Sequence, residues 1–225
     1  MAEPGSYEGT TNLVTLTDPQ SPAAEAYRAL RMNLAFTSLD RQLRAFVVTA
    51  PAAAGLTSNV AANLAVVMAR AGQHVCLVDA DLRRPSLHDL FHVPQEPGLT
   101  TVMLSQDPTA TVTFAASSVP GLSLLPSGAL PPNPADILGS NRMGELLDDL
   151  KQMADVVIFQ APPVTVAVDA SVLAAQTDGL ILVVRTGHTR RDRIEQAKEL
   201  LERFRVRILG TVLTDAPDRG LLTGY

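Results

Sequence analysis

The stretch that decides the fold is residues 45–85, AFVVTAPAAAGLTSNVAANLAVVMARAGQHVCLVDADLRRP. An apolar run leads through a loop of small residues into a helical pattern, and a second apolar run ends at two aspartates and two arginines. This order is typical of a nucleotide-binding strand–helix–strand unit, in which loop N–H groups and a helix N-terminus face a phosphate. A phosphate loop of the G-x-x-x-x-G-K-[ST] type ends in lysine, and this loop has none.

The rest of the chain continues the alternation of strands and helices. Strands are expected at 46–49, 75–79, 122–125, 155–159, 180–185 and 207–213. Helices are expected at 21–36, 58–71, 85–91, 98–104, 136–153, 169–176 and 189–204. This pattern predicts an α/β fold with a mostly parallel sheet and helices on both faces. In such sheets the site lies beyond the carboxyl ends of the strands.

Composition limits the class of protein. The chain has 225 residues, 46% of them hydrophobic, and a net charge of -5, which argues against a general nucleic-acid binder. The lone Cys76 lies in an apolar run, so we expect a buried, inert thiol and a reducing, cytoplasmic setting. No signal peptide or membrane span is expected. We expect a flexible arm at 1–20, one domain at 21–215 and a flexible tail at 216–225.

Four predicted strands end in residues suited to phosphate chemistry. The loop after the first strand offers hydroxyl groups, Asp79 and Asp81 follow the second, Gln160 a later one, and Thr214 the last. Phosphate-transfer sites combine such groups with a lysine that neutralises the terminal phosphates. The chain has only Lys151 and Lys198, both remote from the loop in sequence. An acidic turn after a strand is also common without any function, and this alternative stays open for the two aspartates and for Arg83.

Glu25, Arg28 and Arg31 recur every three residues along the first predicted long helix. Residues at this spacing are neighbours on a helix surface, so they form one charged ridge. Composition alone favours a solvated helix face.

Several stretches in this order resemble the bacterial tyrosine-kinase family of capsule and exopolysaccharide systems, which is related to the partitioning and division-site ATPases. They are SPAAEAYRALRMNL, VAANLAVVMARAGQHVCLVDADLRRPSLHDLF, PGLTTVML, LPSGALPPNPADILGS, DVVIFQAPPV and DGLILVVRTGHTRRDRIEQAKELL. The similarity covers nearly all of 21–215 and implies a P-loop NTPase-like domain of the deviant-Walker, partitioning-ATPase type. In the family, the ridge of Glu25, Arg28 and Arg31 matches an oligomerisation motif.

The chain departs from the family pattern in the phosphate loop. Where the family has a loop like APGEGKSTTAANLA, Ala54 and Leu56 replace two glycines, and Thr57 replaces the lysine. Cβ atoms at the glycine positions crowd a bound phosphate, and the missing lysine removes a charge-assisted contact worth about 1.5–3 kcal/mol. Ser58 keeps the hydroxyl that would bind Mg²⁺.

Further departures lie outside the loop. Gln160 is neutral where the family has an aspartate, Thr214 replaces an asparagine that recognises the base, and one terminal residue, Tyr225, remains of a C-terminal tyrosine cluster. The resemblance therefore implies a degenerate nucleotide site and remnant Mg²⁺ and catalytic positions. The nucleotide positions are Ala54, Gly55, Leu56, Thr57, Ser58, Asn59, Arg83 and Thr214; the metal positions are Ser58, Asp79 and Asp81; the catalytic positions are Asp79 and Asp81.

Three functions follow as hypotheses. The first is a catalytically impaired, kinase-like regulatory subunit of capsule or exopolysaccharide assembly and export, bound to a membrane polysaccharide co-polymerase, to itself or to a sibling kinase. The second is an active ATP-dependent protein-tyrosine kinase with a divergent loop and Tyr225 or Tyr7 as acceptor. The third is a partitioning-type ATPase relative. Any nucleotide is expected to be ATP or ADP with Mg²⁺, the alternative being no cofactor. The expected location is cytoplasmic, or peripheral at the inner membrane face through a partner.

Overall fold

The computed structural model describes residues 13–37, 42–53, 56–107 and 111–216. Within these ranges, six strands form one parallel sheet in the order β3-β2-β4-β1-β5-β6. The strands are β1 (Ala45–Thr49), β2 (Val75–Asp79), β3 (Leu122–Leu125), β4 (Val156–Gln160), β5 (Leu180–Arg185) and β6 (Ile208–Thr214). The predicted fold class is confirmed, and each strand lies within one residue of its expected bounds.

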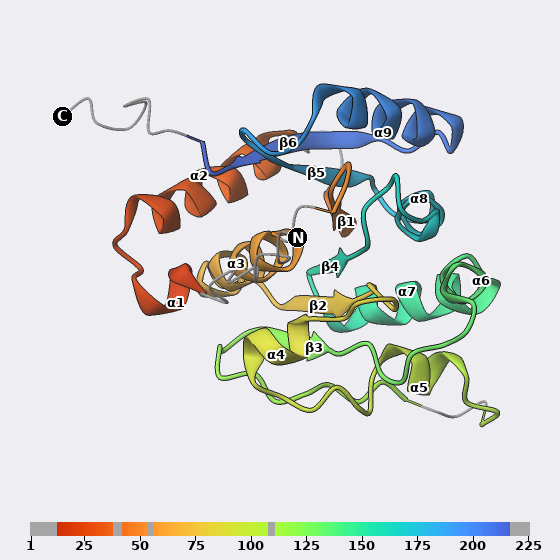
Figure 1. Cartoon of the computed structure of the whole chain (residues 1–225). Helices are drawn as coiled ribbons and strands as arrows, with labels where there is room; N and C mark the ends of the chain where they lie inside the picture. The colour runs from red at the N-terminus through yellow and green to blue at the C-terminus, as the bar shows by residue number, and fades with distance from the viewer. Residues whose placement is uncertain (1–12, 38–41, 54–55, 108–110, 217–225) are drawn as a thin grey trace, which may run out of the picture.

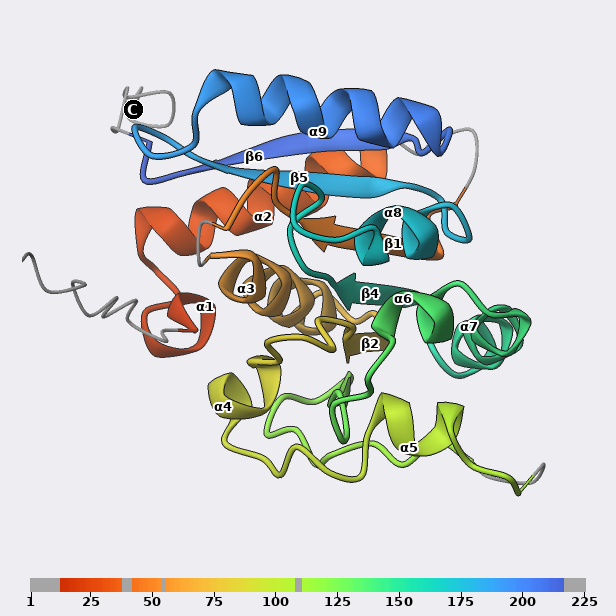
Figure 2. The same ribbon diagram turned by 45° about the vertical axis from the view of Figure 1, so that its right-hand side comes forward.

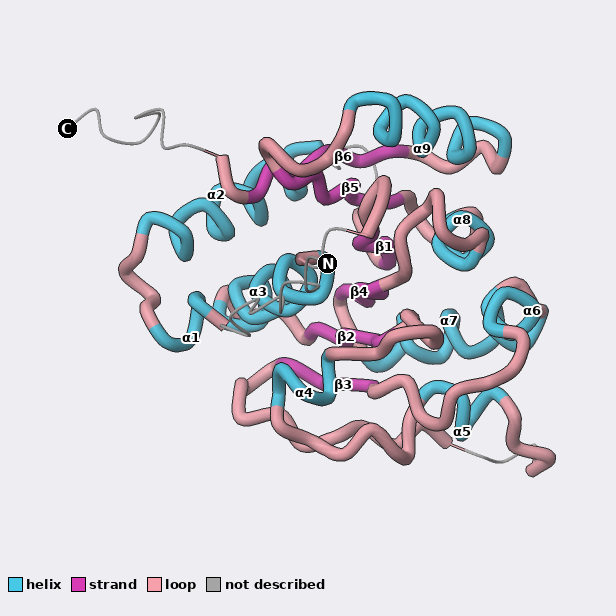
Figure 3. Tube along the Cα trace, in the orientation of Figure 1, coloured by secondary structure: helices cyan, strands magenta, loops and turns pink. Residues whose placement is uncertain are grey.

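Helices cover both faces of the sheet, as Figures 1 and 2 show. They are α1 (Val14–Thr17), α2 (Pro22–Thr37), α3 (Thr57–Arg70), α4 (Leu87–Phe91), α5 (Leu99–Met103), α6 (Pro134–Leu138), α7 (Asn141–Met153), α8 (Asp169–Ala174) and α9 (Arg191–Arg203). In the secondary-structure colouring of Figure 3, the magenta strands form a layer between two groups of cyan helices.

Successive side chains of each strand point to opposite faces of the sheet, so the sheet has one hydrophobic core on each face. In β1, for example, Val48 packs on the face that α1 to α4 cover, whereas Val47 packs under α5 to α9. The strands carry apolar residues on both sides because neither face of this sheet meets water. Residues of β1, β2 and β4 are fully buried along their length.

The strand order brings three carboxyl ends together. Gln160 at the end of β4 is paired with Val48 of β1 on one side and with Asp79 of β2 on the other. The chain crosses from β1 to β2 over the position of β4, so a switch in strand order falls beside β1, where α/β sheets bind their ligands. The first loop and the acidic turn therefore lie at one edge.

Part of the predicted flexible arm at 1–20 is a short helix, α1, that packs on the domain. Leu13 and Thr15 are buried, and α1 packs against α2 and α3. Thr15 donates to Asn63 Oδ1 from its backbone N–H at 3.0 Å and from its hydroxyl at 2.8 Å. These bonds hold α1 against α3.

The helix predicted at 136–153 is two helices. α6 ends at Leu138 with Gly139 as its C-cap, and Ser140 then caps α7 by accepting a hydrogen bond from the backbone N–H of Met143 at 3.2 Å. A serine cap favours a new helix start over continuation. No helix in the described part of the chain is long and apolar enough to cross a bilayer.

Candidate functional site

Asp79, the last residue of β2, is fully buried and holds the next turn of the chain. Its Oδ2 accepts hydrogen bonds from the N–H groups of Ser86 and Leu87, each at 2.9 Å, and its Oδ1 accepts one from Asp81 at 3.3 Å. Burial raises the pKa of Asp79 from 3.8 to about 7, although these hydrogen bonds oppose the rise. The carboxyl group thus has a structural role, because it fixes the start of α4.

Asp81 closes the acidic turn. Its Oδ1 accepts from the N–H groups of Arg83 at 3.2 Å and Arg84 at 2.9 Å, an arrangement typical of an Asx turn. Burial raises the pKa of Asp81, and the hydrogen bonds of the turn and of the Gln160 side chain oppose this rise. Both aspartates predicted as metal and catalytic residues therefore lie together at the predicted strand end.

The guanidinium group of Arg83 forms an ion pair within the protein. Its Nε and Nη2 donate to the two carboxylate oxygens of Asp169 at 2.8 and 3.0 Å. Asp169 lies in the first turn of α8 and is fully buried, while Arg83 is 43% exposed. Arg83, a predicted nucleotide position, makes a bidentate ion pair that ties the acidic turn to α8. Asp169 was not predicted from the sequence, although an acid that begins a helix was a visible signal.

The phosphate loop leads into α3, whose first residue is Thr57. This side chain, at the lysine position, is buried and neutral. Leu56 is the N-cap and gives no side-chain cap, so the first N–H groups of α3 keep their capacity to bind an anion. The hydroxyl of Ser58 bonds that of Ser86 at 2.6 Å. The predicted Mg²⁺ hydroxyl is therefore engaged with the turn that Asp79 holds.

Three buried polar atoms at the strand ends have no hydrogen-bond partner within the described residues. They are Oε1 of Gln160, Oγ1 of Thr214 and Oγ1 of Thr186. Thr186 donates its backbone N–H to the carbonyl of Thr214 at 2.9 Å, so the two hydroxyls belong to adjacent strand ends. Thr214 and Gln160 were predicted for this edge from the sequence. Thr186 was missed, although its place directly after β5 was a signal.

Neither lysine can serve the loop. The guanidinium of Arg44, which precedes β1, donates to the carbonyl of Lys151. Lys151 therefore lies at the amino edge of the sheet, opposite the site. Lys198 lies on α9, where its Nζ is 3.7 Å from Glu202. The loop has no lysine to face a phosphate.

The predicted Mg²⁺ residues are engaged in hydrogen bonds within the fold. In the described part of the chain, no group of three or more His, Cys, Asp or Glu side chains is placed to hold a metal. In nucleotide sites Mg²⁺ is bound through one or two carboxylates together with the substrate phosphates. Here the Ser58 hydroxyl bonds Ser86, and the oxygens of Asp79 accept from backbone N–H groups. Oδ1 of Asp81 accepts from two further backbone N–H groups.

The residues of the predicted charged ridge all lie on α2. Arg28 pairs with Glu25 and also donates to the carbonyl of Pro19. Arg28 and Arg31 both line a pocket beside Arg70 of α3, and Arg31 also lines a second pocket. Of the other predicted positions, Asn59 lies in the first turn of α3, whereas Ala54, Gly55, Tyr7 and Tyr225 lie outside the described residues.

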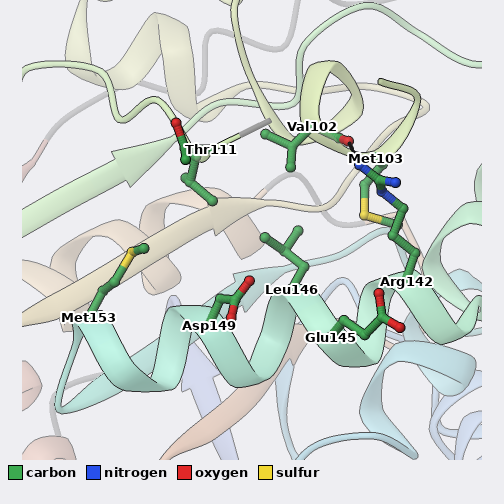
Figure 4. Close-up of a pocket in the computed structure, with 9 residues that line it drawn as sticks. Val102, Met103, Thr111, Arg142, Glu145, Leu146, Asp149 and Met153 are labelled. Carbon is green, nitrogen blue, oxygen red and sulfur yellow. Dashed lines mark hydrogen bonds between the residues drawn. The ribbon is translucent and has the colours of Figure 1, made fainter. Parts of the chain in front are cut away.

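A separate pocket of about 270 Å³ lies between α5 and α7. Figure 4 shows Leu146 on α7 facing Val102 and Thr111, with the carboxylates of Glu145 and Asp149 along the helix. None of its lining residues belongs to the strand-end site. The chemistry implied by the sequence therefore stays at the carboxyl edge of the sheet.

A parallel sheet with a loop–helix unit after β1 and an acidic turn after β2 defines the class as a P-loop NTPase-type domain. The comparisons agree. Residues 46–214 match the family model described as "ParA: NUBPL iron-transfer P-loop NTPase". A structure of the septum site-determining protein MinD from Pyrococcus horikoshii OT3, complexed with Mg-ADP, has a TM-score of 0.60 at 19% identity over 76% of this chain and 69% of its own, and shows the shared fold.

Closer relatives define the family. The chain is 38% identical over 202 residues to the tyrosine-protein kinase YwqD of Bacillus subtilis, which covers 90% of this chain and 85% of that protein. The chimerical protein CapA2B2 has a TM-score of 0.85 at 32% identity, covering 91% of this chain and 90% of its own. The kinase domain of Escherichia coli tyrosine kinase ETK has a TM-score of 0.84 at 30% identity, covering 92% and 82%. The chain belongs to the bacterial tyrosine-protein kinase family of ParA-type P-loop NTPases.

Proposed function

We propose that this chain is a catalytically impaired, tyrosine-kinase-like subunit that regulates capsule or exopolysaccharide assembly and export. The observation that carries the proposal is the neutral, buried Thr57 at the start of α3, with both lysines of the chain away from the loop. Phosphoryl transfer relies on positioning and on cations that stabilise the terminal phosphates. A loop without its cation binds those phosphates through backbone N–H groups alone.

The groups that remain at the site are engaged in holding the fold. Asp79 bonds the start of α4, Ser58 bonds Ser86, and Arg83 bonds Asp169. Each of these contacts is buried or partly buried. Loss of a positioned catalytic contact costs about 10²–10³ in rate, and here several are absent or engaged together.

The regulatory part of the proposal rests on the family resemblance and on α2. A subunit that keeps the scaffold can still bind a membrane polysaccharide co-polymerase, a sibling kinase or a second copy of itself. No nucleic-acid partner is proposed for a chain with net charge -5. Light scattering of the wild type and of Glu25→Ala/Arg28→Ala tests self-association through α2: equal masses at every concentration contradict it, and a lower mass for the variant supports it.

Kinase activity is tested by transfer of labelled phosphate from ATP with Mg²⁺ to tyrosine. The wild type is compared with the restored variant Ala54→Gly/Leu56→Gly/Thr57→Lys, and YwqD serves as the positive control. We expect no incorporation by the wild type above the background without enzyme, and measurable incorporation by the restored variant. Wild-type incorporation within tenfold of the control contradicts the proposal.

The active-kinase alternative requires another cation at the loop. Arg84 is exposed and lies two residues before Ser86, whose hydroxyl contacts Ser58. If the wild type transfers phosphate and Arg84→Gln abolishes transfer, the chain is an enzyme with a relocated cation.

A further inference from the structure

Three arginines line one small pocket where α1, α2 and α3 meet. Arg28 and Arg31 come from α2, and Arg70 is the last residue of α3. Figure 2 shows these helices grouped on one face of the sheet. The other lining residues are neutral: Thr15, Ala24, Val67 and Ala71. The cavity has a volume of about 140 Å³, enough for a small oxyanion.

Two of the guanidinium groups are held in place by neutral acceptors. Arg70 donates from Nη1 to the carbonyl of Thr15, and Arg28 donates from Nη2 to the carbonyl of Pro19. Thr15 is itself fixed through its two hydrogen bonds to Asn63. Arg70 is thus positioned without losing its charge, because a carbonyl accepts a hydrogen bond but neutralises nothing.

The pocket carries uncompensated positive charge. Arg28 pairs with Glu25, but neither Arg31 nor Arg70 makes a salt bridge in the part of the chain that the structure describes. Two positive charges therefore remain in one recess, and the N–H groups of Arg31 have no protein acceptor among those residues. Guanidinium groups are donors only, so such a recess favours an oxyanion.

We propose that this arginine pocket binds a phosphomonoester. A phosphomonoester carries a charge of about −1.5 to −2 near neutral pH and three acceptor oxygens, which match the positive charges of Arg31 and Arg70. A carboxylate would neutralise only half of this charge. The pocket lies at the C-terminal end of α3, about 20 Å along the helix axis from the phosphate loop at its N-terminal end. It is therefore a second site, and its occupancy does not depend on nucleotide binding at the loop.

The phosphate group could belong to a free small ester or to a phosphorylated side chain of a sibling subunit. Both present the same dianion, so the pocket chemistry is shared. Phenyl phosphate and a short phosphotyrosine peptide separate them. If the two ligands bind with equal affinity, the pocket recognises the phosphate and ring alone. If the peptide binds at least tenfold more tightly than phenyl phosphate, the pocket recognises a phosphorylated polypeptide.

The test is an NMR titration of the full chain with phenyl phosphate at fixed ionic strength. Arg31→Gln removes a charge without removing a described hydrogen bond, and Arg203→Gln on the exposed end of α9 is the matched control. We expect saturable shifts at the amides of Val67 and Ala71, at least tenfold weaker binding in Arg31→Gln, and a change below twofold in Arg203→Gln. Binding should weaken from pH 7.5 to pH 5.5 as the ester gains a proton.

Benzoate provides the carboxylate comparison and should bind at least fivefold more weakly than phenyl phosphate. Equal or tighter binding of benzoate, equal binding by Arg31→Gln, or the absence of saturation overturns the proposal. Shifts confined to the start of α3 also overturn it, because they assign the ester to the loop. The restored loop variant should leave the affinity of this pocket unchanged.

Discussion

The carboxyl ends of β1 and β2 meet at one edge but differ in what their residues do for the fold. After β2, Asp79 and Asp81 accept backbone hydrogen bonds that build the acidic turn and begin α4. After β1, a lysine at the position of Thr57 would contact a bound phosphate. It would not be needed to hold any described part of the chain. The difference shows why a site can keep its carboxylates and lack its cation: the former also hold the fold together.

Arg83, like the two aspartates, holds the fold together, whereas the loop after β1 does not. Its ion pair with Asp169 joins segments 86 residues apart in the sequence. Residues that look catalytic by their resemblance can therefore be present for stability alone, and only measurements on both strand ends separate the two roles.

The largest effect on stability is expected at Asp79. Asp79→Ala leaves the buried N–H groups of Ser86 and Leu87 without acceptors and should lower the free energy of unfolding by about 3 kcal/mol. Thr57→Ala should cost less than about 1 kcal/mol. Urea denaturation of both variants measures the contrast. Equal losses would mean that the two strand ends do not differ as described.

Arg83→Ala should lower the free energy of unfolding by about 2 kcal/mol, because it leaves Asp169 buried and unpaired. The figure is below that of a fully buried pair, since the guanidinium is 43% exposed. Asp169→Asn should recover part of the loss in the double variant. Chemical denaturation of the four proteins of this cycle gives the coupling energy; zero coupling contradicts the assigned pair.

Stability should depend on pH through Asp79. Its pKa is about 7 in the folded chain, against an ordinary value of 3.8, so between these two values the folded state holds a proton that the unfolded state has lost. The stabilisation is complete below about pH 4 and is lost as the pH rises through 7, with a slope of about 1.4 kcal/mol per pH unit at most. Asp79→Asn should flatten this slope between pH 5 and 7. Identical slopes by urea denaturation would rule out Asp79 as the source.

The smallest effect is expected at the hydroxyl pair. Ser58→Ala and Ser86→Ala should each lower the free energy of unfolding by about 1 kcal/mol, and the double variant by little more, since one hydrogen bond is shared. Thermal unfolding followed by circular dichroism measures the three variants. Additive losses would show that the two hydroxyls act independently.

Much of the fold follows from local patterns. Apolar runs predict all six strands of the described sheet, and Gly72 ends α3 with a φ of 91°, as a glycine at that place predicts. The break between α6 and α7 was missed because the helical pattern continues through Gly139 and Ser140, and only the cap at Ser140 reveals the new start.

The sequence predicts where the site residues lie, but it does not predict which side chains they contact. Strand ends predict where Asp79, Asp81 and Gln160 gather, because carboxyl ends of parallel strands share an edge. The partners of Ser58 and Arg83 lie 28 and 86 residues away, and no local pattern specifies such contacts. The helix α1 was missed for the same reason, since it depends on the contact of Thr15 with Asn63.

Calorimetric titration with ADP and Mg²⁺ tests the central claim most directly, with the wild type beside Ala54→Gly/Leu56→Gly/Thr57→Lys. A lysine contact of about 1.5–3 kcal/mol corresponds to a factor of roughly ten to a hundred in the dissociation constant. We predict that the wild type binds ADP at least tenfold more weakly than the restored variant. Wild-type binding as tight as that of the restored variant would contradict the claim that the altered loop has lost affinity for phosphate.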